Sequence, residues 1–171
     1  MARKKDYREC KVTPFHSGVS GFTDIAEYYL YFAPGVDSAH AGKEIPDANG
    51  ELFGRLMKAA KLQQDSKIVR RVNQKTWDSL KLSEDVLDFE YLRLIMHQCK
   101  SDHGALYALL RHIRNAIVHG YIYIWKKKSG NFIYLMDIDS GKHKPTAKIV
   151  VTDKILASWM NILKTESGEN K

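Results

Sequence analysis

The chain has 171 residues, which suits one compact domain, since domains typically run to about 100 to 150 residues. Hydrophobic residues make up 44% of it, which excludes a disordered or fibrous protein, and no apolar run is long enough to span a membrane. The net charge of +7 is concentrated at the two ends, in residues 1–11 and 121–171, which indicates either a polyanionic partner such as nucleic acid or a solvated surface that keeps the protein soluble.

The N-terminal quarter of the chain alternates between irregular segments and one short helix. Residues 1–21 contain Pro14 and two glycines among few apolar positions, which predicts an irregular lead-in. Residues 24–32 are rich in aromatic side chains at helical spacing and predict a short helix. Residues 34–50 contain two prolines and three glycines, which predicts a long loop.

Four further helices are expected before residue 120. The apolar residues of 51–64 recur at helical spacing, and those of 66–80 do so less regularly. Residues 83–95 begin with Ser83, a suitable N-cap, which is followed by two acidic residues that complement the helix dipole. A last helix runs from Asp102, another suitable cap, to about Val118.

After Gly120 the pattern changes to short runs of β-branched and aromatic residues. Residues 121–125 and 132–136 predict two strands, and the polar segment 126–131 between them predicts the turn of a hairpin. Residues 147–151 predict a third strand. A closing helix, capped by Thr152 or Asp153, is then expected to run to about residue 164.

These elements predict a mainly α protein of the α+β kind: a helical bundle with a small antiparallel hairpin or sheet appended near its C-terminal end, and a final helix. We expect a single domain. Its parts are the lead-in 1–21, the helical bundle 22–119, the hairpin, strand and closing helix of 120–164, and a frayed tail, 165–171.

The helix expected over residues 104–119 has two unlike faces. At about 100° per residue, one face collects Leu106, Leu109, Leu110, Ile113, Ala116 and Ile117. The opposite face begins with Gly104 and Ala108, whose small side chains allow a second helix to approach closely. One turn later that face becomes cationic and titratable. It carries Arg111, Asn115, Val118 and His119, with His112 at its edge and Arg114 on its flank. Because buried charges need partners, we expect a homodimer in which two copies of the helix 102–119 meet and open into a wet cleft.

The segment Arg114-Asn115-Ala116-Ile117-Val118-His119 resembles the signature of the HEPN superfamily. That signature is an Arg and, four to six residues later, a His, with a polar residue, often Asn, directly after the Arg. Gly120 and Tyr121 extend the resemblance to the longer form seen in HEPN toxins. The resemblance implies a HEPN-like helical bundle and a metal-independent endoribonuclease that acts as a homodimer without a cofactor.

The residue types of the motif suit that chemistry. Histidine is the side chain suited to act as acid or base near neutral pH, which makes His119 the candidate for that role. Arg114 presents a fixed fork of donors for phosphate oxygens, and Asn115 can orient the phosphate or His119, one turn away. Tyr121 can stack on a base or bind a phosphate. We therefore interpret Arg114, Asn115 and His119 as catalytic residues.

Simpler interpretations of the same residues stay open. His119 can serve only to stabilise the helix dipole, Arg114 can pair with Glu90 or Asp102 on the surface, and Tyr121 suits the core equally well.

The supporting RNA contacts are less specific than the motif itself. Arg111 and His112 suit a supporting role beside the motif better than a catalytic one. Lys126, Lys127 and Lys128 predict either a solvated turn or, next to aromatic residues, a contact with an RNA backbone. We treat all five, together with Tyr121, as candidate RNA-binding residues.

The cysteines and histidines give little sign of a metal site. His97, Cys99 and His103 fit no standard zinc spacing, and no fourth ligand is evident, so we expect no metal. The two cysteines, Cys10 and Cys99, do not form a disulfide framework. Without a signal-peptide pattern, the sequence predicts a cytoplasmic protein with reduced thiols.

The partners that follow from the resemblance are RNA and a second copy of the chain. A toxin or an antiviral abortive-infection effector is the role that it implies, with an antitoxin as a further partner. In HEPN toxins a nucleotidyltransferase can act on the Tyr of the extended motif, which corresponds to Tyr121. The alternative function is a HEPN-type RNA-binding, protein-interaction or dimerisation module that does not cleave RNA.

Overall fold

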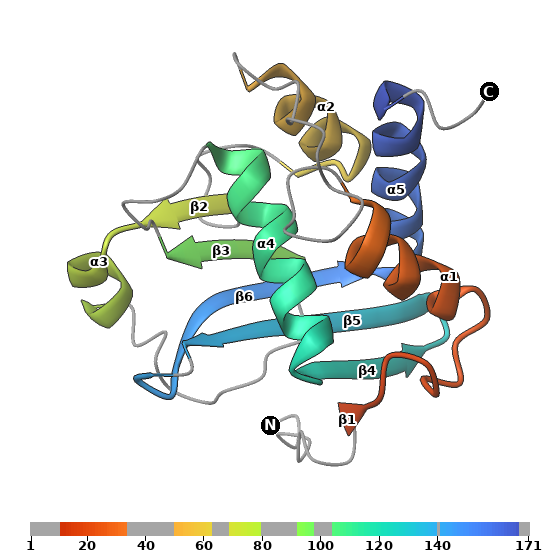
Figure 1. Cartoon of the computed structure of the whole chain (residues 1–171), viewed down its shortest axis with the longest axis horizontal. Coiled ribbons are helices and arrows are strands. Elements are labelled where there is room, and N and C mark those ends of the chain that lie inside the picture. The colour runs from red at the N-terminus through yellow and green to blue at the C-terminus, as the bar shows by residue number, and fades with distance from the viewer. Residues whose placement is uncertain are drawn as a thin grey trace.

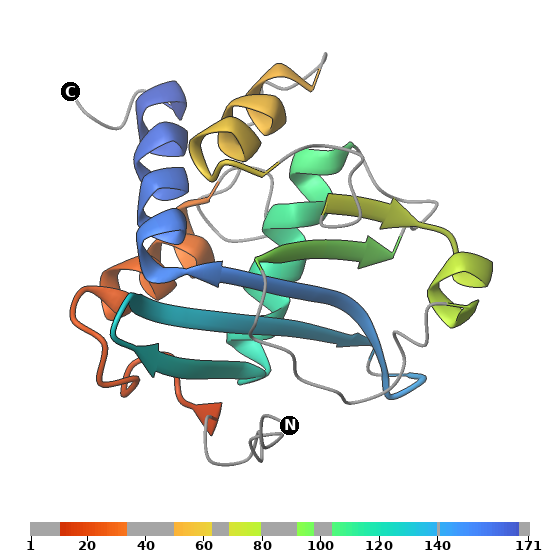
Figure 2. The ribbon, with the colours of Figure 1, turned by 180° about the vertical axis from the view of Figure 1, so that it is seen from behind.

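A single sheet organises the molecule in the computed structural model. The structure describes residues 11–33, 50–62, 69–79, 92–97, 104–139 and 141–167. Helices α1 and α4 lie over one face of the sheet, whereas α2 and α5 stand together at one end (Figures 1 and 2). The main hydrophobic core fills the space between these helices and the sheet. This is an α/β fold in which the sheet, and not a helical bundle, is the central element.

Within the described residues, the sheet has six strands in the order β1-β4-β5-β6-β3-β2. The strands are β1 Lys11–Val12, β2 Val69–Val72, β3 Arg93–His97, β4 Ile122–Lys127, β5 Gly130–Asp139 and β6 Lys144–Thr152. All neighbouring pairs are antiparallel except β2 and β3, which run parallel. The two longest strands, β5 and β6, therefore occupy the centre of the sheet and carry most of its pairing.

The helices are α1 Phe22–Glu27, η2 Tyr28–Phe32, α2 Glu51–Ala59, α3 Gln74–Ser79, α4 Ala105–Val118 and α5 Asp153–Ser167. The α4 helix crosses the sheet over β5 (Figure 1). In the described part of the chain, no helix is both long enough and apolar enough to cross a membrane.

The hairpin of β4 and β5 forms because apolar residues alternate with period two in both strands. Ile122, Ile124, Ile133 and Leu135 point into the core beneath α4. Tyr123 and Tyr134, which are paired in register, point to the opposite face and form a second cluster there. The alternation thus buries aliphatic side chains on one face of the sheet and aromatic side chains on the other, which is typical of a central hairpin and not of an appended one.

The expected fold class is wrong, and the reason lies in two regions. The hairpin that we expected to be an appendage is the middle of the sheet. Residues 66–80, expected to be one helix, contain β2 and the short α3, and Leu94 and Ile95, expected at the end of a helix, lie in β3. Short apolar runs do not distinguish a buried strand from a buried helix, and strand pairing with β6 decides the outcome for β3.

Other expected elements are confirmed. Residues 24–32 are helical, α2 falls within 51–64, and the three C-terminal strands lie where the sequence indicated. Thr152 caps α5, since its Oγ1 accepts a hydrogen bond from the backbone N–H of Ile155 at 3.2 Å. The α5 helix continues to Ser167, three residues beyond its expected end at Lys164. The helix expected at 83–95 lies outside the described residues as far as residue 91.

Candidate functional site

The α4 helix ends in a tight backbone turn that sets the position of His119. Gly120 adopts a φ of 69°, a left-handed conformation that glycine reaches without strain. The N–H of Gly120 donates to the carbonyl of Ile117 at 3.2 Å, and the N–H of Tyr121 donates to that of Ala116 at 2.9 Å. This pair of bonds is a Schellman motif. It stops the helix at His119, the C-cap residue, and sends the chain into β4.

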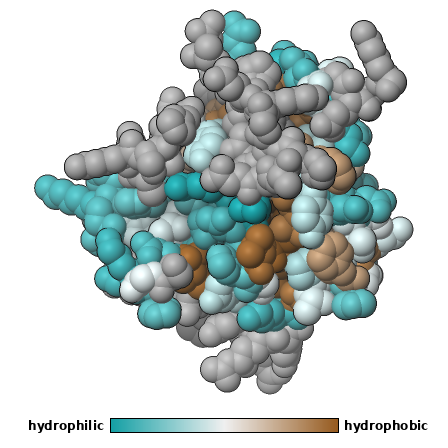
Figure 3. Space-filling model, in the orientation of Figure 1, coloured by the Kyte–Doolittle hydropathy of each residue, from teal (hydrophilic) through white to brown (hydrophobic). Residues whose placement is uncertain are grey.

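The outer side of α4 carries most of the predicted catalytic residues. The side chain of His119 is exposed, and those of Arg114 and Arg111 are half-buried; Asn115, also half-buried, lies at the border with the inner side. Val118, an exposed hydrophobic residue with 52% of its surface accessible, lies on the same side. The face of the molecule that carries α4 shows hydrophilic side chains beside a hydrophobic patch (Figure 3). The Arg–Asn–His motif is therefore accessible to a ligand at the C-terminal end of α4.

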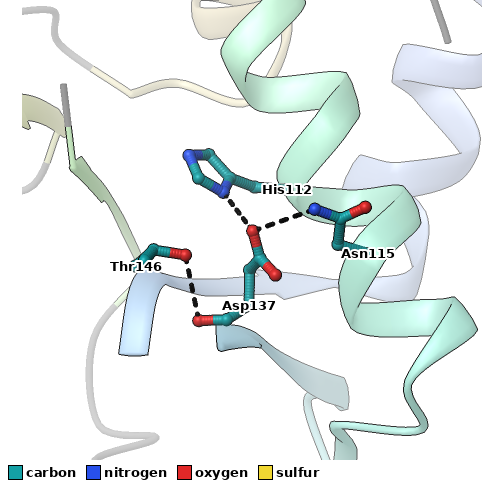
Figure 4. Close-up of polar contacts among 4 residues, drawn as sticks. All are labelled: His112, Asn115, Asp137 and Thr146. Carbon is teal, nitrogen blue, oxygen red and sulfur yellow. Dashed lines mark hydrogen bonds and ion pairs between the residues drawn. The ribbon is translucent and has the colours of Figure 1, made fainter. Parts of the chain in front are cut away.

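The inner side of α4 holds a polar network that the sequence did not indicate. Nδ1 of His112 lies 2.6 Å from Oδ2 of Asp137, a residue of β5. Nδ2 of Asn115 donates to the same carboxylate oxygen at 3.2 Å (Figure 4). His112 and Asp137 are both buried, with exposed fractions of 1% and 5%. These three side chains link α4 to the centre of the sheet.

Asp137 lies where the pairing of β5 with β6 is irregular. Asp137 pairs with Ala147, but the next residue, Ile138, pairs with Pro145, so that Thr146 has no partner in the register. The hydroxyl of Thr146 donates to the backbone carbonyl of Asp137 at 3.3 Å (Figure 4). Bulges of this kind change the direction of a side chain and are frequent beside functional sites.

The environment of Asp137 favours its charged form. Burial alone would raise the pKa of its carboxyl group. The hydrogen bond to His112, the positive charge of that imidazole when protonated, and hydrogen bonds from Asn115 and Thr146 together outweigh burial and lower the pKa below its ordinary value. Asp137 is therefore a carboxylate at neutral pH, and Nδ1 of His112 must carry the proton of their shared hydrogen bond.

The burial of His112 argues against one predicted role. We expected its side chain to contact RNA, but with 1% of its surface exposed it is enclosed between α4 and the sheet. Its Nε2 atom is also buried and has no hydrogen-bond partner among the described residues. A buried, hydrogen-bonded imidazole that fixes a helix on a strand explains its position, so that any effect of His112 on a ligand must act through Asp137 and Asn115.

The three lysines of the β4–β5 hairpin do not form one strip. Lys126 donates a hydrogen bond to the carbonyl of Gly18 at 2.9 Å. The ammonium group of Lys127 lies instead over two aromatic rings, 4.1 Å from the centre of Trp125 and 4.3 Å from that of Phe132. Lys128 is exposed in the turn. Neighbouring strand residues point to opposite faces, which separates Lys126 from Lys127.

Tyr121 is half-buried at the start of the hairpin, and the ammonium group of Lys11 lies 5.2 Å from the centre of its ring. This position leaves both its predicted role as an RNA contact and its alternative role in packing open.

The small residues Gly104 and Ala108 do not together form an exposed surface on which a second helix could pack. Ala108 is fully buried, with an exposed fraction of 0%, so that no second helix can contact it. Gly104 is exposed just before the helix begins. The predicted homodimer therefore stays a prediction, and its surface would have to be the exposed side that carries Val118.

Among the described residues, no group of three or more His, Cys, Asp or Glu side chains is arranged to hold a metal ion. Cys99 and His103, and likewise Cys10, lie outside those residues, as do Glu90 and Asp102, the expected partners of Arg114.

Asp137 is the residue that sequence reasoning missed, although its strand contains a signal. In the alternation of β5, Ile133 and Leu135 face the core, and Asp137 occupies the next core-facing position. A carboxylate at a core-facing position requires a partner, because an unpaired buried charge is strongly unfavourable. The sequence therefore indicates that Asp137 has a partner but does not identify it.

Comparisons with protein-family models, with curated proteins and with solved structures find no match to this chain.

Proposed function

We propose that the chain binds RNA at the C-terminal end of α4 and cleaves it as a metal-independent endoribonuclease. One observation carries the proposal: the turn at Gly120 leaves the imidazole of His119 exposed, one helical turn from Asn115, whose side chain is tethered to a buried carboxylate. A titratable group beside a preorganised polar group is the combination that acid–base catalysis requires.

The reaction would proceed through the 2′-hydroxyl of the RNA. The O2′ atom forms a bond to phosphorus while the bond between phosphorus and O5′ breaks, which gives a 2′,3′-cyclic phosphate and a 5′-hydroxyl. An imidazole accepts the proton from O2′, and an imidazolium supplies a proton to O5′. The guanidinium of Arg114 stabilises the charge on the phosphorane, for which its planar fork of donors is suited.

The spacing of Arg114 and His119 supports the proposal because it resembles the HEPN motif. The sheet-centred fold is not the helical bundle of that superfamily, so the support comes from the motif and its exposure alone. A toxin or an antiviral effector is the role that a nuclease of this kind would serve.

A homodimer would supply two copies of His119 to one site, one as base and one as acid. The exposed Val118 lies between Arg114 and His119 in the sequence and offers an apolar contact for the second copy. In a C₂ dimer each contact occurs twice, so that the contact made by Val118 would stabilise the interface twice.

Replacement of His119 by Ala tests the assignment. We expect cleavage of a labelled single-stranded RNA in the presence of EDTA to slow by about 10² to 10⁴. His16→Ala is a matched control, because His16 is also exposed but belongs to the segment that follows β1. Cleavage at the wild-type rate by the His119→Ala variant would contradict the proposal, as would equal losses in both variants.

A non-catalytic RNA-binding module is the second candidate, and the aromatic cluster around Lys127 favours it. Trp125 and Phe132 are opposite each other in the hairpin and both are half-buried, as single-strand binding surfaces often are. Salt-dependent binding of RNA without cleavage would select this function over the nuclease.

A further inference from the structure

The side-chain amide of Asn115 is held in one orientation. Its Nδ2 donates to Oδ2 of Asp137 at 3.2 Å. A carboxylate only accepts hydrogen bonds, so the amide must turn its nitrogen toward Asp137 and its oxygen away. Figure 4 shows this oxygen on the side opposite to Asp137.

The atom that Asn115 offers to a ligand is therefore an acceptor. Oδ1 of Asn115 has no hydrogen-bond partner among the described residues, and it is not among the buried polar atoms. The side chain as a whole is half-buried, with its nitrogen on the inner side of α4. An amide oxygen carries a partial negative charge and is unsuited to a phosphate oxygen, which also only accepts.

The network behind Asn115 prevents the amide from turning over. The second hydrogen bond to Oδ2 of Asp137 comes from His112, whose ring is enclosed between α4 and β5. If the amide flipped, its oxygen would face a buried carboxylate, and both groups would be acceptors without a donor between them. The orientation of Asn115 is thus decided by a residue 22 positions away on the central strand.

We propose that Oδ1 of Asn115 accepts a hydrogen bond from a ribose 2′-hydroxyl, and that Asp137 acts as the positioning residue that aims it there, so that this pair selects RNA over DNA. The inference rests on the proposed function and deepens it. In RNA the 2′-hydroxyl is a donor near the 3′-phosphate, and Asn115 belongs to the same end of α4 as Arg114, the proposed phosphate ligand. A hydroxyl has one hydrogen, so in the bound state O2′ donates it to Oδ1, and for the reaction it turns toward His119, because an amide oxygen is too weakly basic to take the proton.

The test compares the binding of RNA and DNA by the full chain. The probes are a fluorescently labelled single-stranded RNA and the DNA of the same sequence, measured by anisotropy in the His119→Ala background, so that no RNA is cleaved. We expect RNA to bind about fivefold more tightly than DNA, the contribution of one neutral hydrogen bond. Asn115→Ala and Asp137→Ala, which removes the acceptor of the Asn115 amide, should bring this ratio close to one and leave the affinity for DNA unchanged.

Thr146→Val is the matched control, because Thr146 donates to the backbone carbonyl of Asp137 and helps to lower the pKa of its carboxyl group, but is not a hydrogen-bond partner of Asn115. This variant should keep the preference for RNA. The affinity for DNA serves as the folding control in each variant, since a misfolded protein would lose both affinities. Asn115→Ala reports on the contact even if Asp137→Ala does not fold.

The outcomes separate this inference from the nuclease. A preference for RNA that survives Asn115→Ala overturns the inference, whether or not the wild type cleaves RNA. Equal affinity of the parent protein for RNA and DNA overturns it too. If the preference depends on Asn115 and Asp137 but the wild type does not cleave RNA, the inference stands and the catalytic proposal fails.

Discussion

The two sides of α4 use polar residues in different ways. On the inner side, His112 and Asp137 are buried, and both bond within a network that joins the helix to β5. On the outer side, His119 is exposed beyond the last turn and Arg114 is half-buried. One helix thus carries two histidines seven residues apart, of which one fixes the structure and the other is accessible for chemistry. Burial, and not residue type, therefore distinguishes the structural histidine from the accessible one.

If the inner network is structural, its loss should have the largest effect on stability. We expect Asp137→Ala to lower the free energy of unfolding by about 3 kcal/mol, because it leaves buried His112 and half-buried Asn115 without their shared acceptor. Urea denaturation followed by circular dichroism measures this. The exposed Asp78 is the control, and Asp78→Ala should change stability by less than about 0.5 kcal/mol. Equal small effects for the two variants would mean that the network does not hold α4 in place.

The pH dependence of stability also tests the role of Asp137 on the inner side of α4. The pKa of Asp137 is lowered in the folded protein, whereas in the unfolded chain it is about 3.9. The folded state therefore binds fewer protons, so that this contribution is present above about pH 4 and is lost as the pH falls through the lower, folded pKa. We expect the free energy of unfolding to decrease from about pH 5 downward, and less steeply in Asp137→Asn. Denaturation curves at a series of pH values measure it, and parallel profiles for the two proteins would contradict it.

The smallest expected effect on stability is on the outer side. Val118→Glu places a charge at a position of which 52% is exposed, so the free energy of unfolding should change by less than about 0.5 kcal/mol. If two copies meet through this side of α4, the same variant should shift the protein from dimer to monomer in light scattering after gel filtration. Val118→Thr, which keeps the shape, should remain dimeric. A wild-type monomer, or a dimer that tolerates Val118→Glu, would remove α4 from the interface.

Local sequence patterns were sufficient to predict the helices and strands that are stabilised mainly by their own residues. The α4 helix has a continuous apolar face and a glycine at the position where a Schellman motif needs one. The β4–β5 hairpin alternates with period two over both strands. By contrast, β2 and β3 are short, and they are strands because β3 pairs with β6, which lies some 50 residues later in the chain.

The candidate site likewise has features that follow from local sequence and features that depend on tertiary packing. The sequence by itself determined that Arg114, Asn115 and His119 share the end of one helix, because helical spacing is a local property. Only the tertiary structure decided that His112 is buried, that Asp137 is its partner, and that the amide of Asn115 turns its oxygen outward. These facts depend on where α4 lies on β5, which is set by the packing of the whole core and by a bulge in the central pair of strands.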